Sequence, residues 1–190
     1  MLLFILGLIL FFGLHSISII NEPFRNRMAA KFGDVSWKIG YSVVSILGFV
    51  LMVYGYGHYR YESTVLYVVF PWLTHLTMLL MLPVFPLLIA TYFPGRISTY
   101  TRHPMLYATI IWSFSHLLVN GRLIDVLLFG AFLVWAILDL VSMRSRVQRS
   151  LPEVPNFWGN DLIALVLGIA LYGGFLGWLH SALIGVPVLG

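Results

Sequence analysis

Long apolar runs alternate with short polar segments along the whole chain. Each run approaches the ~20 residues that an α-helix needs to span the hydrocarbon core of a bilayer. The run at the N-terminus lacks the basic start and the small-residue cleavage site of a secretory signal, so we expect it to remain as a spanning helix. The pattern predicts about six spanning helices, over residues 1–20, 37–57, 66–93, 104–120, 123–143 and 158–184.

The third run, residues 66–93, is the longest of the six and contains three prolines. Pro71, Pro83 and Pro86 each lack the backbone N–H donor that a continuous helix uses. We therefore expect this span to be interrupted.

The composition indicates a membrane protein. Hydrophobic residues make up 60% of the chain and charged residues 9%, with a mean hydropathy of +0.93, whereas soluble domains carry about 25% charged residues. We predict an all-α fold, a polytopic transmembrane helix bundle that forms a single transmembrane domain over residues 1–190. The chain has no cysteine, which excludes disulfides, thiolate catalysis and cysteine-ligated zinc or iron–sulfur sites.

The lysines and arginines predict the orientation of this bundle. Cytoplasmic loops of membrane proteins carry the excess of positive charge. Nine of the 11 basic residues fall in loops on one side of the predicted helices, and only Arg60 and Arg122 fall on the other side. With six helices, both termini are then periplasmic in the inner membrane of a bacterium. This topology accounts for the basic residues, so we expect no nucleic-acid partner.

Six histidines are the main candidates for chemistry. An imidazole is costly inside a bilayer unless it faces the protein interior and has a partner, so an intramembrane histidine predicts a functional site. The six are His15, His58, His75, His103, His116 and His180. His58 and His180 fall near the predicted outer boundary among aromatic residues, where interfacial anchoring is the alternative role.

The spacing of the histidines favours a cofactor held between helices. No two histidines lie within four positions, as the paired spacings of a zinc site would require. His103 and His116 are separated by ~20 Å of helical rise and lie on different faces, so they cannot share one metal ion. A buried neutral imidazole is also an axial ligand of haem iron, and haem b is the cofactor that we predict.

Arg102 and His103 form a second candidate site. They immediately precede Pro104, a residue type favoured in the first turn of a helix. Basic side chains beside unpaired backbone N–H groups favour an anionic group, such as a lipid phosphate or a cofactor carboxylate. The alternative is an interfacial cap whose basic side chains snorkel to the surface.

Asp139 is the only carboxylate well inside an apolar run. We expect it to pair with Arg144 or Arg146 near the end of that run. The sequence has no carboxylate pair for acid–base catalysis, no G-x-S-x-G elbow and no glycine-rich phosphate loop.

Three segments resemble the NnrU family of bacterial membrane proteins. They read LFFGLHS near the N-terminus, TRHPMLY followed by SHLLVNG in the middle, and GWLHSALIGV near the C-terminus. The resemblance extends over nearly the whole chain and implies a role in the nitric oxide and nitrite metabolism of denitrifying bacteria. The same segments are similar to 15-cis-zeta-carotene isomerase, a haem b membrane enzyme of the same superfamily, so isomerisation of a lipophilic polyene is an alternative function.

The resemblance to the isomerase implies roles for individual residues. His15 and His116 match iron ligands, and Ser113 stands where the isomerase has a redox-switched cysteine ligand. Serine is a poor substitute for a thiolate on iron, which weighs against the same ligand exchange here. With the predicted helix ends, His15 lies ~8 Å from the cytoplasmic surface and His116 ~6 Å from the periplasmic one. His75 matches His116 better in depth and is the alternative ligand.

Two further functions stay open. A non-enzymatic helper for the maturation of denitrification reductases would use the histidines as hydrogen-bonded packing groups. The segment RHPMLY is also similar to an element of isoprenylcysteine-type methyltransferases, but the glutamate pair of that family is missing here. The sequence therefore does not decide whether the protein is an enzyme, which would be a haem-dependent isomerase or oxidoreductase.

Overall fold

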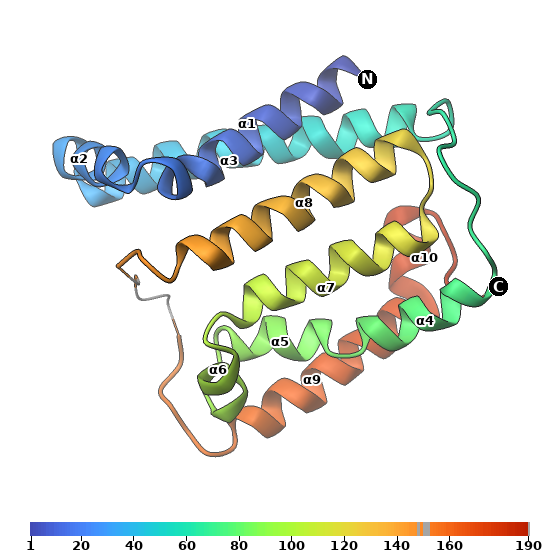
Figure 1. Cartoon of the computed structure of the whole chain (residues 1–190). Helices are drawn as coiled ribbons and strands as arrows, with labels where there is room; N and C mark the ends of the chain where they lie inside the picture. Colours follow the sequence, from blue (N-terminus) through green and yellow to red (C-terminus); the bar gives the residue numbers. More distant parts are fainter. Residues whose placement is uncertain (148, 150–152, 190) are drawn as a thin grey trace. The chain divides into compact units, whose positions relative to one another are not determined.

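A computed structural model describes residues 1–147, 149 and 153–189 (Figure 1). These residues form helices joined by turns and loops, and the only strand-like pairing among them is an isolated bridge between Val65 and Arg122. The helices are α1 (Leu2–Ile20), α2 (Glu22–Phe32), α3 (Asp34–Tyr59), α4 (Trp72–Met81), α5 (Val84–Ala90), α6 (Arg96–Thr101), α7 (Pro104–Val119), α8 (Leu123–Ser142), α9 (Asn160–Gly174), the π-helical turn η1 (Phe175–Leu179) and α10 (His180–Ile184). The predicted all-α fold is confirmed.

Five segments of the described chain are long and apolar enough to cross a membrane. They are Leu2–Ile20, Asp34–Tyr59, Trp72–Ala90, Leu123–Ser142 and Asn160–Ile184. The remaining predicted span forms α7, a shorter apolar helix. The protein is therefore a multi-pass membrane protein, while the count of six spans and the periplasmic termini stay predictions.

The third span is interrupted, as its prolines predict. Helix α4 ends at Met81, and α5 begins after Pro83, which has no N–H to continue the ladder. Pro86 is tolerated because it lies in the first turn of α5, where N–H groups have no helical partner. At the break the amide of Leu82 bonds to the carbonyl of Leu79, and the hydroxyl of Tyr172 donates to the carbonyl of Met78 at 2.7 Å. A backbone group freed in a bilayer thus finds a protein partner.

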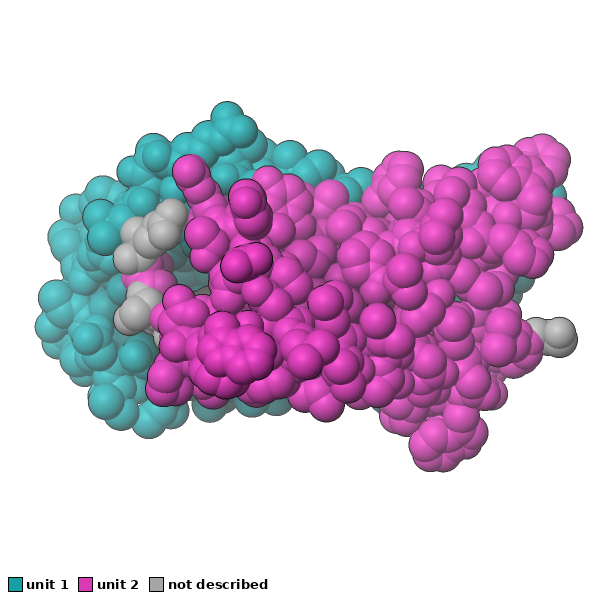
Figure 2. Space-filling view, turned by 90° about the horizontal axis from the view of Figure 1, so that it is seen from below, with its two compact units in different colours: residues 1–69, 120–148 teal, residues 70–119, 149–190 magenta. Residues whose placement is uncertain are grey.

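Contacts divide the chain into two compact units, which Figure 2 colours separately. Unit 1 comprises residues 1–69 and 120–148, and unit 2 comprises residues 70–119 and 149–190. The single transmembrane domain over residues 1–190 stays a prediction.

Unit 1 is held together by the close packing of α1 against α3. Gly7, Gly48 and Gly55 form the contact, and a methyl group on any of them would meet backbone atoms of the facing helix. Small residues at such a contact let two membrane helices approach closely and gain van der Waals energy. Phe4 and Met52 fill the core of this unit together with Ile124 of α8.

A polar network joins α3 to the start of α8 in unit 1. The buried carboxylate of Asp125 accepts a hydrogen bond from the hydroxyl of Tyr56 at 2.7 Å and another from the amide of Arg122 at 3.2 Å. The guanidinium of Arg122 donates to the carbonyls of Tyr61 and Ser63 at 3.1 and 2.9 Å. This network fixes the start of α8 against α3, and so helps to position the residues that α8 contributes to the site described below.

Unit 2 contains α4 to α7 and α9 to α10. Val84, Leu87 and Ala108 form its core, and Gly168 of α9 packs directly against Pro86 of α5. The carboxylate of Asp161 accepts hydrogen bonds from the amides of Arg96 and Ile97, at 2.9 and 3.0 Å, at the start of α6. These contacts connect α9 with the segment that leads into α7.

Candidate functional site

His15 lies in unit 1, on the last two turns of α1. Its ring nitrogen Nδ1 donates a hydrogen bond to the backbone carbonyl of Phe11 at 2.7 Å. A carbonyl oxygen can only accept, so this bond places the proton of the neutral imidazole on Nδ1 and leaves the lone pair on Nε2. In this tautomer, Nε2 is the nitrogen that can bind a metal ion.

Aromatic rings surround His15. The Phe11 ring stacks on the imidazole with centroids 4.2 Å apart, and Tyr41 and Trp135 meet it edge-on at 5.2 and 5.8 Å. These rings come from α1, α3 and α8, so three helices of unit 1 position the histidine. Asp139, one turn beyond Trp135 on α8, is close enough to interact electrostatically with His15 and with Tyr41.

A groove of about 310 Å³ lies beside His15 between α1 and α3. It is lined by Phe11, His15, Tyr41, Ser42, Ser45, Ile46 and Phe49. The polar lining residues are nearest to α2, and the apolar ones lie farther along the helices. The groove therefore has one polar end and one apolar end, which suits an amphiphilic molecule.

Three buried polar atoms of unit 1 have no hydrogen-bond partner among the described residues. They are Ser45 Oγ, Trp135 Nε1 and Arg146 Nε. The guanidinium of Arg146 forms an ion pair with Asp139 through Nη2, which confirms the predicted pairing of this carboxylate with one of the two nearby arginines. The side chain of Arg146 is only 10% exposed, so its remaining donor is removed from water.

His116 lies in unit 2, in the last turn of α7. Its Nδ1 donates to the backbone carbonyl of Trp112 at 2.8 Å, the same arrangement as at His15. The ring of Trp112 lies 5.3 Å from the imidazole, and His180 of α10 is close enough to interact with it electrostatically. The Nδ1 of His180 also donates to a backbone carbonyl, that of Val186, at 2.7 Å.

Ser113, which stands at the position of the isomerase cysteine, is completely buried. Its hydroxyl donates to the backbone carbonyl of Thr109 at 2.6 Å, and Ile110 O lies 3.2 Å away. The hydroxyl is thus occupied within its own helix.

The remaining candidates lie apart from these aromatic surroundings. His75 is exposed on α4, and His58 is exposed on α3 with its ring 4.4 Å from that of Tyr54. Arg102 is exposed and has a left-handed backbone with φ of 60°, which ends α6, and Pro104 begins α7 as predicted. Anion binding by Arg102 and His103 stays a prediction.

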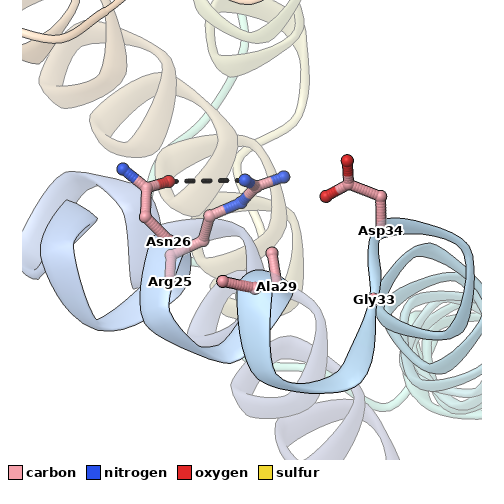
Figure 3. A pocket seen from close by; sticks show the side chains of 6 residues that line it. Arg25, Asn26, Ala29, Gly33 and Asp34 are labelled. Carbon is pink, nitrogen blue, oxygen red and sulfur yellow. Dashed lines mark hydrogen bonds between the residues drawn. The ribbon is translucent and has the colours of Figure 1, made fainter.

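A second pocket, of about 410 Å³, lies at the junction of α2 and α3 (Figure 3). Arg25 and Asp34 project from its two sides, and a guanidinium nitrogen of Arg25 donates to the side-chain oxygen of Asn26 at 3.4 Å. Within the described residues, no group of three or more His, Asp or Glu side chains gathers as a metal site would require.

The hydroxyl of Tyr67, between α3 and α4, has a pKa that differs from its ordinary value. Burial, together with the nearby Asp125 carboxylate, raises the pKa of its hydroxyl. The hydroxyl donates to the carbonyl of Asn120 at 2.8 Å. A raised pKa keeps this donor protonated, so it can hold the loop before α8 over the whole physiological pH range.

The sequence missed several residues that surround His15. Tyr41 and Ser45 are four positions apart, as are Trp135 and Asp139, so each pair shares one helix face. Polar or aromatic residues at this spacing within an apolar run were the available signal. Because His15 and His116 belong to different units, their pairing at one iron stays a prediction.

Comparison with known proteins decides the family. A family model described as NnrU protein matches residues 3–188. The chain belongs to the NnrU family. No curated protein and no solved structure matches it. The resemblance seen in the three sequence segments is therefore confirmed for the NnrU family.

Proposed function

We propose that this NnrU-family protein binds haem b in the bacterial inner membrane, with His15 and His116 as the axial ligands. Bound haem supplies an iron that can change oxidation state and bind small diatomic molecules. The role that we assign is redox or nitric oxide chemistry linked to nitrite metabolism, with denitrification reductases as candidate partners.

One shared feature carries the proposal. Both imidazoles donate Nδ1–H to the backbone carbonyl four residues earlier, at 2.7 Å for His15 and 2.8 Å for His116. Histidines that bind metal usually donate their other ring N–H to such an acceptor, because the bond fixes the tautomer and the ring orientation. The residues present therefore fit haem as ligands.

The surroundings of the two histidines support the same assignment. Phe11 and Trp135 flank His15, and Trp112 flanks His116. Flat apolar rings suit a porphyrin, and they keep water away from a ligand nitrogen. At His15, the carboxylate of Asp139, which is paired with Arg146, is close enough to interact electrostatically with the imidazole.

The isomerase alternative receives less support from this site. It would use Ser113 in place of an exchangeable cysteine ligand, but the Ser113 hydroxyl donates to Thr109 O within its own helix. A serine hydroxyl is also a weak ligand for haem iron. Isomerisation would then have to proceed without that exchange.

Absorption spectroscopy tests the haem proposal. The full chain, purified from haem-replete cells, should show a Soret band that shifts when dithionite is added. His15→Ala and His116→Ala should each lower the haem content or change the band, while the exposed His58→Ala should leave it unchanged. A protein without the band, or bands unaltered by both ligand substitutions, would overturn the assignment.

Nitric oxide tests the role. Adding it to the reduced wild-type protein should change the haem spectrum if an iron position can open. A spectrum that does not respond, with haem present, would contradict nitric oxide binding and leave electron transfer as the role.

A further inference from the structure

Most of the unsatisfied buried donors lie in the unit that contains His15. Four buried side-chain nitrogen or oxygen atoms of the described residues have no hydrogen-bond partner, and three of them belong to unit 1. These are Ser45 Oγ, Trp135 Nε1 and Arg146 Nε, and the fourth is Ser115 Oγ in unit 2. Buried polar groups in folded proteins are nearly always hydrogen-bonded, so such a group requires an explanation.

The chemistry of these atoms identifies the missing partner. An indole N–H and a guanidinium N–H can only donate, and a serine hydroxyl can donate as well. All three therefore need the same kind of partner, an oxygen atom that accepts a hydrogen bond. One bound acceptor group, rather than several unrelated defects, would satisfy donors that come from α3, α8 and the segment after α8.

Trp135 contacts His15, Ser45 lines the same groove as His15, and Arg146 is linked to this region through Asp139. The ring of Trp135 lies 5.8 Å from that of His15, and Asp139 follows one turn later on the same face of α8. Asp139 holds Arg146 through an ion pair. Ser45 lines the groove that His15 also lines.

The guanidinium of Arg146 favours an anionic acceptor. Arg146 is paired with Asp139, and both the Asp139 carboxylate and the Arg25 guanidinium are close enough to act on Tyr41 beside His15. The Nε–H of Arg146 stays without a partner beyond its ion pair, and a carboxylate oxygen can accept this hydrogen bond. The apolar end of the groove, lined by Phe11, Ile46 and Phe49, suits the body of a molecule that carries this carboxylate.

We propose that Ser45, Trp135 and Arg146 bind a carboxylate of the porphyrin whose iron His15 ligates. This inference rests on the proposed haem function and adds a recognition element to it. It places carboxylate recognition in unit 1, in addition to the anion site that the sequence predicts at Arg102 and His103 in unit 2.

An iron-free porphyrin separates carboxylate recognition from iron ligation. Haem-free full-length protein in nanodiscs is titrated with protoporphyrin IX and with its dimethyl ester, and binding is followed by porphyrin fluorescence against empty nanodiscs. The ester lacks the anionic acceptors but keeps the macrocycle. We expect the wild-type protein to bind the free acid about tenfold more tightly, the effect of losing charge-assisted hydrogen bonds.

Variants then test whether the named residues cause the tighter binding of the free acid. Ser45→Ala combined with Trp135→Phe removes a hydroxyl and an N–H while preserving the aromatic ring, and should bring the acid-to-ester ratio close to one. Asp139→Asn combined with Arg146→Met, which removes the ion pair without leaving a lone charge, should do the same. Ser113→Ala, a buried serine of unit 2 with a satisfied hydroxyl, should keep the wild-type ratio.

The outcomes distinguish this inference from the haem proposal. The carboxylate site would be overturned if the wild-type protein bound acid and ester with similar affinity, or if it bound no porphyrin. It would also be overturned if both double variants kept the wild-type preference for the acid. A Soret band that responds to His15→Ala and His116→Ala in the same preparations would still support haem ligation in those cases. Conversely, a ratio that depends on the named residues would support the carboxylate site even if the iron ligands prove to be different.

Discussion

The surroundings of His15 and His116 differ although the two histidines are held in the same way. In both cases a backbone carbonyl fixes the imidazole through Nδ1. Around His15, in unit 1, there is a groove, a buried ion pair and a set of donors without partners. Close to His116, the hydroxyl of Ser113 is satisfied within its own helix, and the buried hydroxyl of Ser115 has no partner among the described residues. Unit 1 thus combines more features that can select a ligand than the surroundings of His116 do.

The buried ion pair of unit 1 should produce the largest effect when it is broken. Arg146→Met leaves the carboxylate of Asp139 buried without its partner and should lower the free energy of unfolding by about 3–5 kcal/mol. The double variant Asp139→Leu/Arg146→Met should recover most of this loss. Thermal unfolding in nanodiscs measures both, and equal stability of the single and double variants would contradict a buried pair.

The contact between α1 and α3 should produce the next largest effect. Gly7→Ala would bring a methyl group against the backbone of Met52, so overpacking should cost about 1–3 kcal/mol of unfolding free energy. Gly13→Ala on the same helix is the matched control, because nothing lies within 4 Å of its added methyl. If the two variants unfold at the same temperature, close packing of these helices does not stabilise unit 1.

Two serines with buried hydroxyls should sharpen the comparison, because their removal should affect stability differently. In ligand-free protein, Ser45→Ala removes an unsatisfied hydroxyl and should leave stability unchanged or raise it slightly. Ser113→Ala removes a satisfied hydroxyl and should lower the free energy of unfolding by about 0.5–1.5 kcal/mol. Denaturant titrations of both variants measure the difference, and a loss at Ser45 equal to that at Ser113 would show that Ser45 has a protein partner.

Tyr67 should show the smallest effect, because 38% of the residue is exposed. Its pKa is raised in the folded protein by burial and by Asp125, so the folded state holds the phenolic proton more tightly than the unfolded state does. Its contribution to stability is present below the ordinary tyrosine pKa of about 10 and is lost as pH rises through the folded value. Tyr67→Phe should reduce the alkaline fall in unfolding temperature, and an unchanged pH profile would refute this linkage.

The interrupted third span and the ion pair show which local features the sequence can predict. Pro83 lacks an N–H wherever it is placed, so a break near it follows from the residue alone, and the helix does end there. Asp139 inside an apolar run requires a cation nearby in the chain, and Arg146, in the segment after α8, supplies it. Both predictions depend on groups that are close in sequence.

The neighbours of His15 on other helices could not be predicted from the sequence. They include Tyr41, Ser45 and Trp135. They approach His15 from α3 and α8, which are distant from α1 along the chain. In a membrane helix, an apolar face is compatible with lipid as well as with protein, so hydrophobic periodicity does not indicate which face packs inward. The partners of His15 therefore could not be predicted from the pattern that predicted its helix.

The sequence by itself determined an all-α multi-pass membrane protein of the NnrU family with histidines in its apolar helices. Apolar length and motif identity are local properties, so one chain suffices to read them. Only the tertiary structure decided that His15 stands among aromatic rings, a groove and three unsatisfied donors, whereas His75 is exposed. The reason is physical: backbone contacts at Gly7, Gly48 and Gly55 set how α3 meets α1, and that packing brings together side chains that are remote in sequence.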